Sequence, residues 1–309
     1  RNKFTTHAAC ATEAPIDEED AFRNSGRLVF NPYSIDDMQA LYKQDPKFTA
    51  DIVVNISVKD DNTIPNSKVK LRDDGEGDLK IWAVPNCLQV ENRYLVSVDI
   101  GGKSTTSDYT VMTVIDRFGM IPTVKGKPKV VARYRGHVRH DKLAWMAAAL
   151  AHYYDDALLV IESNTADREK NNNTEGDHFL TILQEIADYY DNLYQRTSSS
   201  ENVEDNVLAK YGFQTNKLTK QQVIDNLEEF IDDNLYEEPD KEMYHELRIY
   251  ERHDDGSLGN IVGNGNHDDV VMSTGIGLFV SLTDMEKPSW KKAERRSRGG
   301  DGVHTAAKI

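Results

Sequence analysis

Tyr94-Leu-Val-Ser-Val-Asp99 is an apolar run that ends on an acid, and it opens the most regular part of the chain. Two similar runs follow, Thr110 to Asp116 and Lys129 to Tyr134, and the turns between them are too short for a crossover helix. We therefore expect an antiparallel meander of three strands. A helical pattern over 142–154 leads to Ala157-Leu-Leu-Val-Ile-Glu162, which we expect to lie parallel to a neighbouring strand.

Acidic residues stand where these predicted elements begin or end. Asp99 closes the first run and Glu162 closes the parallel one, while Asp268 and Asp269 open a predicted helix that runs to Leu278. Carboxylates gathered at one point repel one another and raise their own pKa values unless a cation lies between them. We therefore predict a site for two divalent ions, Mg²⁺ or Mn²⁺, which would activate a water and stabilise the leaving oxygen of a phosphodiester.

Each acid also has an ordinary explanation. Asp99 precedes two glycines and is a common turn residue, and acids at a helix start, such as Asp268 and Asp269, cap free N–H groups. Glu162 is harder to explain in this way, because an ionised group at the margin of a buried strand is costly without a partner. Asp108 fits either a turn or an acid near Asp99. The joint occurrence of the three positions is what favours a metal site.

Other polar residues give weaker indications. His267 adjoins the acid pair, so it would ligate a metal or touch phosphate, or be an ordinary loop histidine. Asn164, Lys217 and Lys220 are predicted DNA contacts, although lysines around a helix start are often only solvated. Gly101-Gly-Lys-Ser104 ends like a nucleotide-binding P-loop but lacks its first glycine, so no ATP site is expected.

The composition limits the possible partners of this chain. Its 309 residues are enough for one large domain or two small ones, and no run approaches the roughly 20 apolar residues of a membrane span, so no membrane partner is expected. The net charge of −15 argues against general coating of nucleic acid, so any DNA contact must be local or metal-assisted. Cys10 and Cys87 are too few for a disulfide framework or a zinc site and fit a reducing cytoplasm.

We divide the chain into three parts. Residues 1–50 are expected to form a linker with one short helix, connecting to a preceding domain. Residues 51–285 are expected to form an α/β domain with an edge β-insertion over 51–90. Residues 286–309 are rich in Lys and Arg, lack periodicity and are expected to be a mobile basic tail.

Three local predictions concern element boundaries. Ser34 is expected to cap the short helix of the linker. The capping box Thr219-Lys-Gln-Gln222 is expected to begin another helix. Met243 to Ile249 is expected to form a hairpin together with the turn that follows it.

Six short motifs in order closely resemble the C-terminal half of the large terminase subunits of tailed phages. They are Glu19-Asp-Ala-Phe-Arg-Asn-Ser-Gly-Arg-Leu-Val-Phe30, Leu79-Lys-Ile-Trp82, Val98-Asp-Ile-Gly-Gly102 with Ser107-Asp-Tyr-Thr110, Val160-Ile-Glu-Ser-Asn164, Tyr211-Gly-Phe-Gln-Thr-Asn216 with Leu218-Thr-Lys220, and Gly265-Asn-His-Asp-Asp269. The resemblance covers most of residues 15–285. It implies a ribonuclease-H-like mixed sheet, with three antiparallel strands followed by parallel strands, flanked by helices.

In that family this half of the chain is an endonuclease that cuts concatemeric viral DNA before and after packaging. The resemblance implies Asp99, Glu162 and Asp269 as the metal-binding triad, with Asp268 and Asp108 as further acids near the metals. It leaves open which of Asp268 and Asp269 binds metal directly. It also implies double-stranded DNA as substrate, and little sequence specificity is expected because no base-reading element stands out.

The resemblance also implies partners and a location. The partners would be an N-terminal ATPase domain of the same full-length chain, the portal or procapsid, and the small terminase subunit. The location would be the cytoplasm of an infected or prophage-carrying bacterium. The Walker motifs of the ATPase are absent from this sequence, so packaging motor activity is not expected of it.

Two other functions stay open. Family members often have Asp-Pro or Asp-Ala after the first acid, whereas Asp99-Ile-Gly-Gly102 also resembles the phosphate-binding hairpin of actin-like sugar kinases. A kinase would need a second Asp-x-Gly loop and a glycine-rich adenosine loop, for which Gly263-Asn-Gly265 is a poor match. A non-catalytic docking module on the portal or procapsid would use the acids only as caps and the basic tail as its contact.

Overall fold

The computed structural model describes residues 27–54, 68–86, 88–101, 108–163, 186–187, 189–196, 211–261 and 266–291. Its elements in chain order are α3 (Pro32–Tyr42), β1 (Phe48–Val53), β2 (Lys68–Arg72), β3 (Leu79–Ile81), β4 (Val90–Glu91), β5 (Tyr94–Asp99), β6 (Thr110–Asp116), the 3₁₀ turn η1 (Phe118–Met120), β7 (Lys129–Gly136), α4 (His140–Tyr153), β8 (Leu158–Ile161), α7 (Lys217–Asp232), α8 (Lys241–Arg248), β9 (Tyr250–Arg252), β10 (Leu258–Asn260), α9 (Asp269–Thr283) and β11 (Ser289–Trp290). A search of these helices finds none with the length and apolar character needed to cross a membrane.

A seven-stranded mixed sheet forms the centre of the fold, in the order β2-β1-β3-β7-β6-β5-β8. β5, β6 and β7 form the expected antiparallel meander, with Leu95 opposite Ile115 and Met112 opposite Tyr134. β8 is reached from β7 through α4 and lies parallel to β5. The predicted ribonuclease-H-like sheet, flanked by helices, is therefore confirmed. β1, β2 and β3 extend it beyond β7 at the edge.

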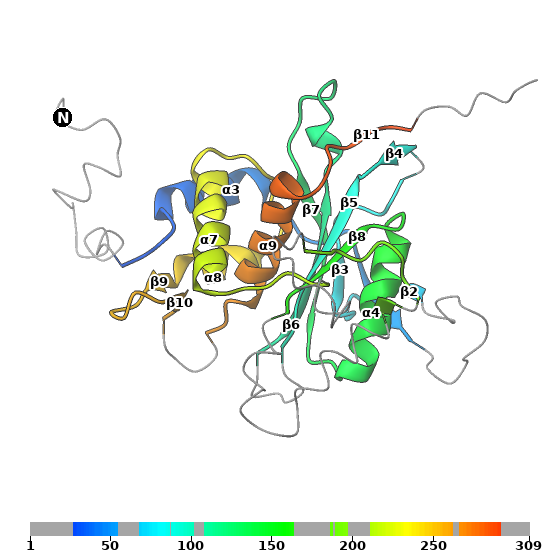
Figure 1. Ribbon diagram of the computed structural model, residues 1–309, viewed down its shortest axis with the longest axis horizontal. Coiled ribbons are helices and arrows are strands. Elements are labelled where there is room, and N and C mark those ends of the chain that lie inside the picture. The colour runs from blue at the N-terminus through cyan, green and yellow to red at the C-terminus, as the bar shows by residue number, and fades with distance from the viewer. Residues whose placement is uncertain are drawn as a thin grey trace, which may run out of the picture.

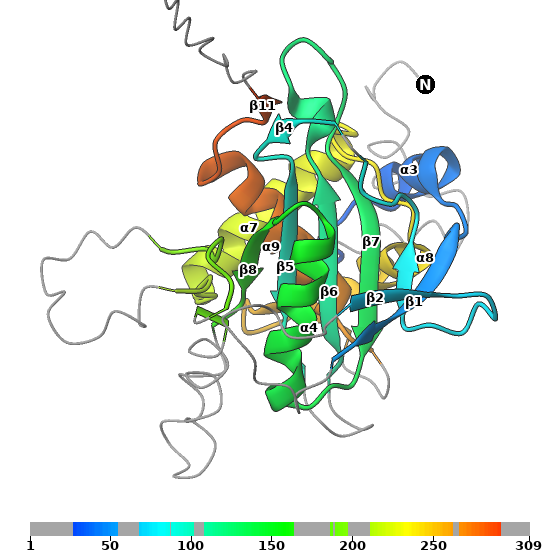
Figure 2. The same ribbon diagram turned by 90° about the vertical axis from the view of Figure 1, so that its right-hand side faces the viewer.

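Helices cover both faces of this sheet (Figures 1 and 2). α4 lies on one face, and α7, α8 and α9 lie on the other. Side chains alternate along each strand, so β5 and β8 contribute to two cores. Val98 and Ile161 pack in the cluster under α4, whereas Leu95 and Val160 pack in the cluster with α7 and α9.

Helix α9 packs against β5 and β6 and is buried along most of its length. A Cβ at Gly277 would lie 2.8 Å from Ile115 Cδ1 and 3.1 Å from Ser97 Cβ, so a glycine lets the helix approach the sheet this closely. Near its C-terminal end, the buried Arg117 guanidinium donates to the carbonyl oxygen of Ser281 at 2.8 Å. A cation suits this end of the helix dipole. The position of α9 on the sheet is thus closely fixed.

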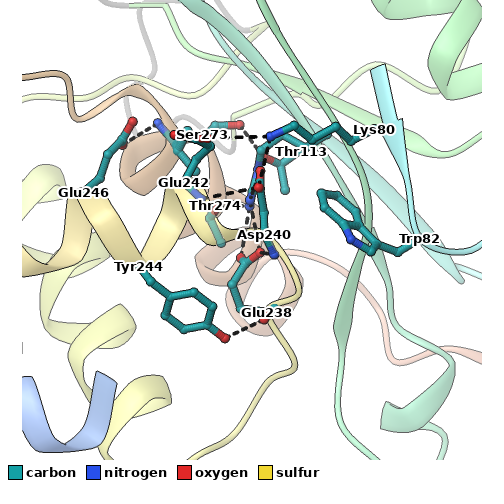
Figure 3. A network of polar contacts seen from close by, with 12 residues as sticks. Lys80, Trp82, Thr113, Glu238, Asp240, Glu242, Tyr244, Glu246, Ser273 and Thr274 are labelled. Carbon is teal, nitrogen blue, oxygen red and sulfur yellow. Dashed lines mark hydrogen bonds and ion pairs between the residues drawn. The ribbon is translucent and has the colours of Figure 1, made fainter. Parts of the chain in front are cut away.

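A buried ionic network joins α9 to the sheet, and Figure 3 shows several of its members. Arg133 of β7 donates to both carboxylate oxygens of Glu238 at 3.0 Å and to Asp240 at 3.1 Å. It also donates to Thr274 of α9 at 2.8 Å. Lys80 of β3 pairs with Asp240 at 3.2 Å from a more exposed side. The network therefore holds the middle of α9 and the segment before α8 against β7.

Several element boundaries differ from the predictions. Asn31, not Ser34, caps α3, because proline follows it at the first helical position and suits that place. Asn216 caps α7 and Thr219 is the third residue of that helix, so the predicted capping box begins three residues too late. Met243 lies in α8 and not in a hairpin, because the apolar residues there repeat at helical spacing, and the hairpin is β9 with β10.

The start of the expected basic tail pairs with the rest of the fold. β11 lies antiparallel to β4, and the Trp290 ring meets the Phe118 ring edge to face at 5.6 Å. Residues 292–309 lie outside the described residues, as do Asn164, Cys10 and Cys87.

Candidate metal centre

The acids predicted from the sequence meet at one edge of the sheet. Asp99 is the last residue of β5, and Glu162 directly follows β8, the parallel neighbour of β5. The N–H of Glu162 donates to the carbonyl before Asp99 at 2.9 Å, so the two residues are adjacent across the sheet. By the alternation of side chains, both point to the face that α9 covers. Asp268 and Asp269 begin that helix.

The electrostatics of Asp99 show that these acids act on one another. Asp99 is 9 % exposed, and burial raises the pKa of its carboxyl well above the usual range. The carboxylates of Glu162, Asp269 and Asp268 raise that pKa further, in that order. Four acids from two strands and one helix therefore share one neighbourhood, and a divalent cation would relieve their repulsion.

Asp269 is the more enclosed of the two acids on α9. Its Oδ2 accepts a hydrogen bond from Tyr109 N at 2.9 Å, and its side chain is 8 % exposed. Burial raises the pKa of Asp269 to about 7 against the opposite effect of that bond, and Asp108 and Asp268 add to the rise. His267 Nδ1 lies 3.8 Å from Asp269 Oδ2 and 3.3 Å from Asp108 Oδ1.

These last residues form a group of possible metal ligands. One ligand atom each from Asp108, His267 and Asp269 lies within 4.8 Å of the other two. Carboxylate oxygens suit Mg²⁺ and Mn²⁺, and an imidazole is tolerated by Mn²⁺. Asp269 belongs to this group and also raises the pKa of Asp99, so it links the group to the acids at the ends of β5 and β8.

Of the three predicted DNA contacts, one lies at the acid cluster, one is exposed on α7 and one lies outside the described residues. Lys220 Nζ lies 3.2 Å from Asp268 Oδ2, so this lysine is at the acid cluster. Lys217 is exposed at the first position of α7. Asn164 lies outside the described residues.

A glutamate that the sequence reasoning missed caps α9. Oε2 of Glu246, from α8, accepts hydrogen bonds from Val270 N at 2.9 Å and Val271 N at 3.1 Å. Asp268 stands at the N-cap position but makes no side-chain capping bond. The explanation of Asp268 as an ordinary N-cap is therefore wrong, whereas Asp269 stands in the first turn of α9, where an acid suits the helix dipole. No local signal marks Glu246, because it lies 24 residues before Val270 in the chain.

An aromatic stack supports the backbone that holds Asp269. The guanidinium carbon of Arg135 lies 3.8 Å from the centroid of the Tyr109 ring, and the His137 ring stacks on Tyr109 with centroids 4.3 Å apart. Gly101 packs against the same segment, since a Cβ there would lie 2.2 Å from the carbonyl oxygen of Asp108. Sequence reasoning missed Arg135 because the strand was expected to end at Tyr134, whereas β7 continues to Gly136.

Comparison with known proteins gives matches only among solved structures. No protein-family model and no curated protein matches the chain. The large terminase nuclease of thermophilic phage G20c with bound magnesium is 16 % identical, with a TM-score of 0.48, and the match covers 81 % of this chain and 96 % of that chain. The nuclease domain of the Thermus phage P74-26 large terminase is 21 % identical, with a TM-score of 0.42 and coverage of 66 % and 85 %. A manganese-soaked, inhibitor-bound terminase nuclease domain of human cytomegalovirus is 8 % identical, with a TM-score of 0.38 and coverage of 62 % and 84 %.

Proposed function

We propose that this chain is a metal-dependent endonuclease that hydrolyses phosphodiester bonds of double-stranded DNA with little sequence specificity. The observation that supports this is the convergence of Asp99, Glu162, Asp268 and Asp269 at one edge of the sheet, where each of the other three raises the pKa of Asp99. Helix capping does not account for the two acids on α9, because Glu246 supplies that cap. A site for divalent cations accounts for all four acids together.

In this proposal Asp99, Glu162 and Asp269 are the principal ligands of two divalent ions, Mg²⁺ or Mn²⁺. We choose Asp269 over Asp268 because it is more buried and lies beside His267. Asp268 is a further ligand at the exposed side, and Asp108 and His267 complete the site next to Asp269. When bound, the two ions would activate a water and stabilise the leaving oxygen of the phosphodiester.

The protein's own residues orient this site. Tyr109 N holds Asp269 through its hydrogen bond, so the carboxylate is fixed before substrate arrives. The Lys220 ammonium neutralises Asp268 at the exposed side, where a DNA phosphate would approach, and we keep Lys220, Lys217 and Asn164 as proposed DNA contacts. With a net charge of −15, the chain would depend on such local cations and on the metals to approach DNA.

The biological role that we propose is the cutting of concatemeric viral DNA during genome packaging. The nuclease would act beside an ATPase domain of the same full-length chain, with the portal or procapsid and the small terminase subunit as partners. This places it in the cytoplasm of an infected or prophage-carrying bacterium.

The test is cleavage of supercoiled plasmid in the presence of Mn²⁺ or Mg²⁺. Wild-type protein is expected to nick and linearise plasmid, and EDTA is expected to stop it. Asp99→Asn and Glu162→Gln keep the side-chain volumes and remove the charges, so each is expected to lower the rate by at least about 100-fold. Asp254→Asn, at an exposed turn residue, is the matched control and is expected to cut like wild type.

The proposal is wrong if wild-type protein cuts no plasmid under these conditions, or if the Asp99 and Glu162 variants cut as fast as the control. Phosphoryl transfer from ATP to a sugar, without nicking, would support the kinase instead. Binding to a portal or procapsid without cleavage would support the docking module.

A further inference from the structure

The N-terminus of α9 is capped by a residue from another helix. Val270 and Val271 are the second and third residues of α9. An N-cap side chain normally accepts hydrogen bonds from the N–H groups at these two positions. Both bond to Oε2 of Glu246, at 2.9 and 3.1 Å. Asp268 stands at the N-cap position, but its side chain makes no capping hydrogen bond.

The Asp268 and Asp269 carboxylates have partners outside α9. Asp268 reaches Lys220 at 3.2 Å, and Asp269 accepts from Tyr109 N at 2.9 Å. Both carboxylates raise the pKa of Asp99, so both lie near it, and neither is turned back to cap its own helix. If the N–H groups of α9 were free, Asp268 would be well suited to cap them, because aspartate is among the strongest N-cap residues.

The placement of Glu246 is costly in itself. The residue is 3 % exposed, and its Oε1 atom is buried with no hydrogen-bond partner in the part of the chain that the structure describes. Burying a carboxyl with one oxygen unpartnered lowers the stability of the fold. The capping of α9 is the compensating interaction that the structure shows for it.

We propose that Glu246 is a positioning residue of the metal site: it caps α9 in place of Asp268 and so keeps the Asp268 and Asp269 carboxylates turned towards Asp99 and Glu162. This inference rests on the proposed function, because it assigns Glu246 to the same site. Glu246 touches neither metal nor DNA in this scheme and acts only through α9. Its removal lets Asp268 turn back to cap its own helix.

The first experiment measures Mn²⁺ binding to metal-free protein by isothermal titration calorimetry. Glu246→Gln keeps a carbonyl oxygen for the two N–H groups and is expected to bind within about twofold of wild type. Glu246→Ala is expected to bind about 10- to 100-fold more weakly. Met243→Ala removes a buried side chain from the same helix without touching the cap, so it is expected to lower stability and leave the Mn²⁺ affinity unchanged.

The second experiment is a double-mutant cycle on urea unfolding midpoints in EDTA, which needs neither metal nor DNA. In the wild-type background Glu246 caps α9, so Asp268→Ala removes no cap and is not expected to lower the urea midpoint. In the Glu246→Ala background, the same change is expected to lower the midpoint, because Asp268 then caps α9.

Additive midpoints, together with an unchanged Mn²⁺ affinity for Glu246→Ala, would overturn this inference. Equal weakening by Glu246→Gln and Glu246→Ala would also overturn it, because glutamine preserves the cap. Protein that binds Mn²⁺ in the expected order but cuts no DNA would support the positioning role and refute the proposed nuclease alone.

Discussion

Replacing Asp269 by Asn is expected to make the metal-free protein more stable at pH 8 while abolishing its activity. Asn has nearly the same shape, and its Oδ1 can still accept from Tyr109 N, so the local packing stays as it is. What the change removes is a buried negative charge beside Asp268 and Asp108. Carboxylates crowded together destabilise a fold by their mutual repulsion when no cation lies between them.

The magnitude follows from the pKa of Asp269, which is raised from 3.8 to about 7. A carboxyl whose pKa is raised in the folded state does not lower the free energy of unfolding below about pH 4, where it is protonated in both the folded and the unfolded state. It lowers that free energy by the full amount above about pH 7, where it is ionised in both states. At about 1.4 kcal/mol for each tenfold change, the full penalty is at most on the order of 4 kcal/mol. Roughly 2 to 3 kcal/mol of it develops between about pH 5 and pH 8.

The assay is urea unfolding of wild type and Asp269→Asn in EDTA at pH 5 and pH 8, followed by tryptophan fluorescence. The free energy of unfolding of the variant minus that of wild type is expected to rise by roughly 2 to 3 kcal/mol from pH 5 to pH 8. When Mn²⁺ is added at pH 8, the free energy of unfolding of wild type is expected to rise and that of the variant to rise much less. The difference between the two proteins then shrinks or reverses.

An advantage that is the same at pH 5 and pH 8 would refute this reasoning, because it would mean that the Asp269 carboxyl does not ionise against a penalty. A variant less stable than wild type at pH 8 in EDTA would refute it as well. Asp254→Asn, at an exposed position, is the control and is expected to show no such pH-dependent gain.

Three further changes test the packing around α9 by urea unfolding. Arg133→Met leaves two buried carboxylates without their guanidinium and is expected to cost about 3 to 5 kcal/mol, whereas Lys80→Met, at the more exposed end of the network, should cost about 0 to 1; equal losses would contradict the buried network. Gly277→Ala is expected to cost about 1 to 3 kcal/mol and to slow plasmid cleavage, because the new Cβ pushes α9 from the sheet, while Gly75→Asn in an open turn should do neither. Arg117→Met is expected to cost about 1 to 3 kcal/mol, because carbonyls at the end of α9 lose their donor, and an unchanged midpoint would contradict that role.

The central sheet was predictable because its strands are continuous apolar runs with short turns between them. The run from Tyr94 to Asp99 and the next two apolar runs could pair only as an antiparallel meander. The helix before Glu162 implied a parallel strand. The acids of the proposed metal site could be picked out for a related reason. Each stands at the end of a strand or the start of a helix, where the topology brings distant residues together.

What the sequence did not reveal depends on contacts between distant residues. Glu246 looks like any acid on an amphipathic helix, and only the packing of α8 against α9 brings it to Val270. Arg133 likewise meets Glu238 across 105 residues. The helix starts were missed by three residues because Asn caps a helix as well as Ser or Thr does, and Asn31 and Asn216 stand three residues before Ser34 and Thr219.

The two ends of α9 are held by side chains from elsewhere, Glu246 at the first turn and Arg117 at the last. Insertion or deletion of a single residue between these anchors would rotate one end against the other by about 100°. If Arg117 kept its bond to the last turn, the first turn with Asp269 would rotate away from Asp99 and lose the Glu246 cap, however well the helix itself formed. The number of residues in α9 is therefore expected to stay constant as related sequences diverge, while gains and losses of length accumulate in the connections around it.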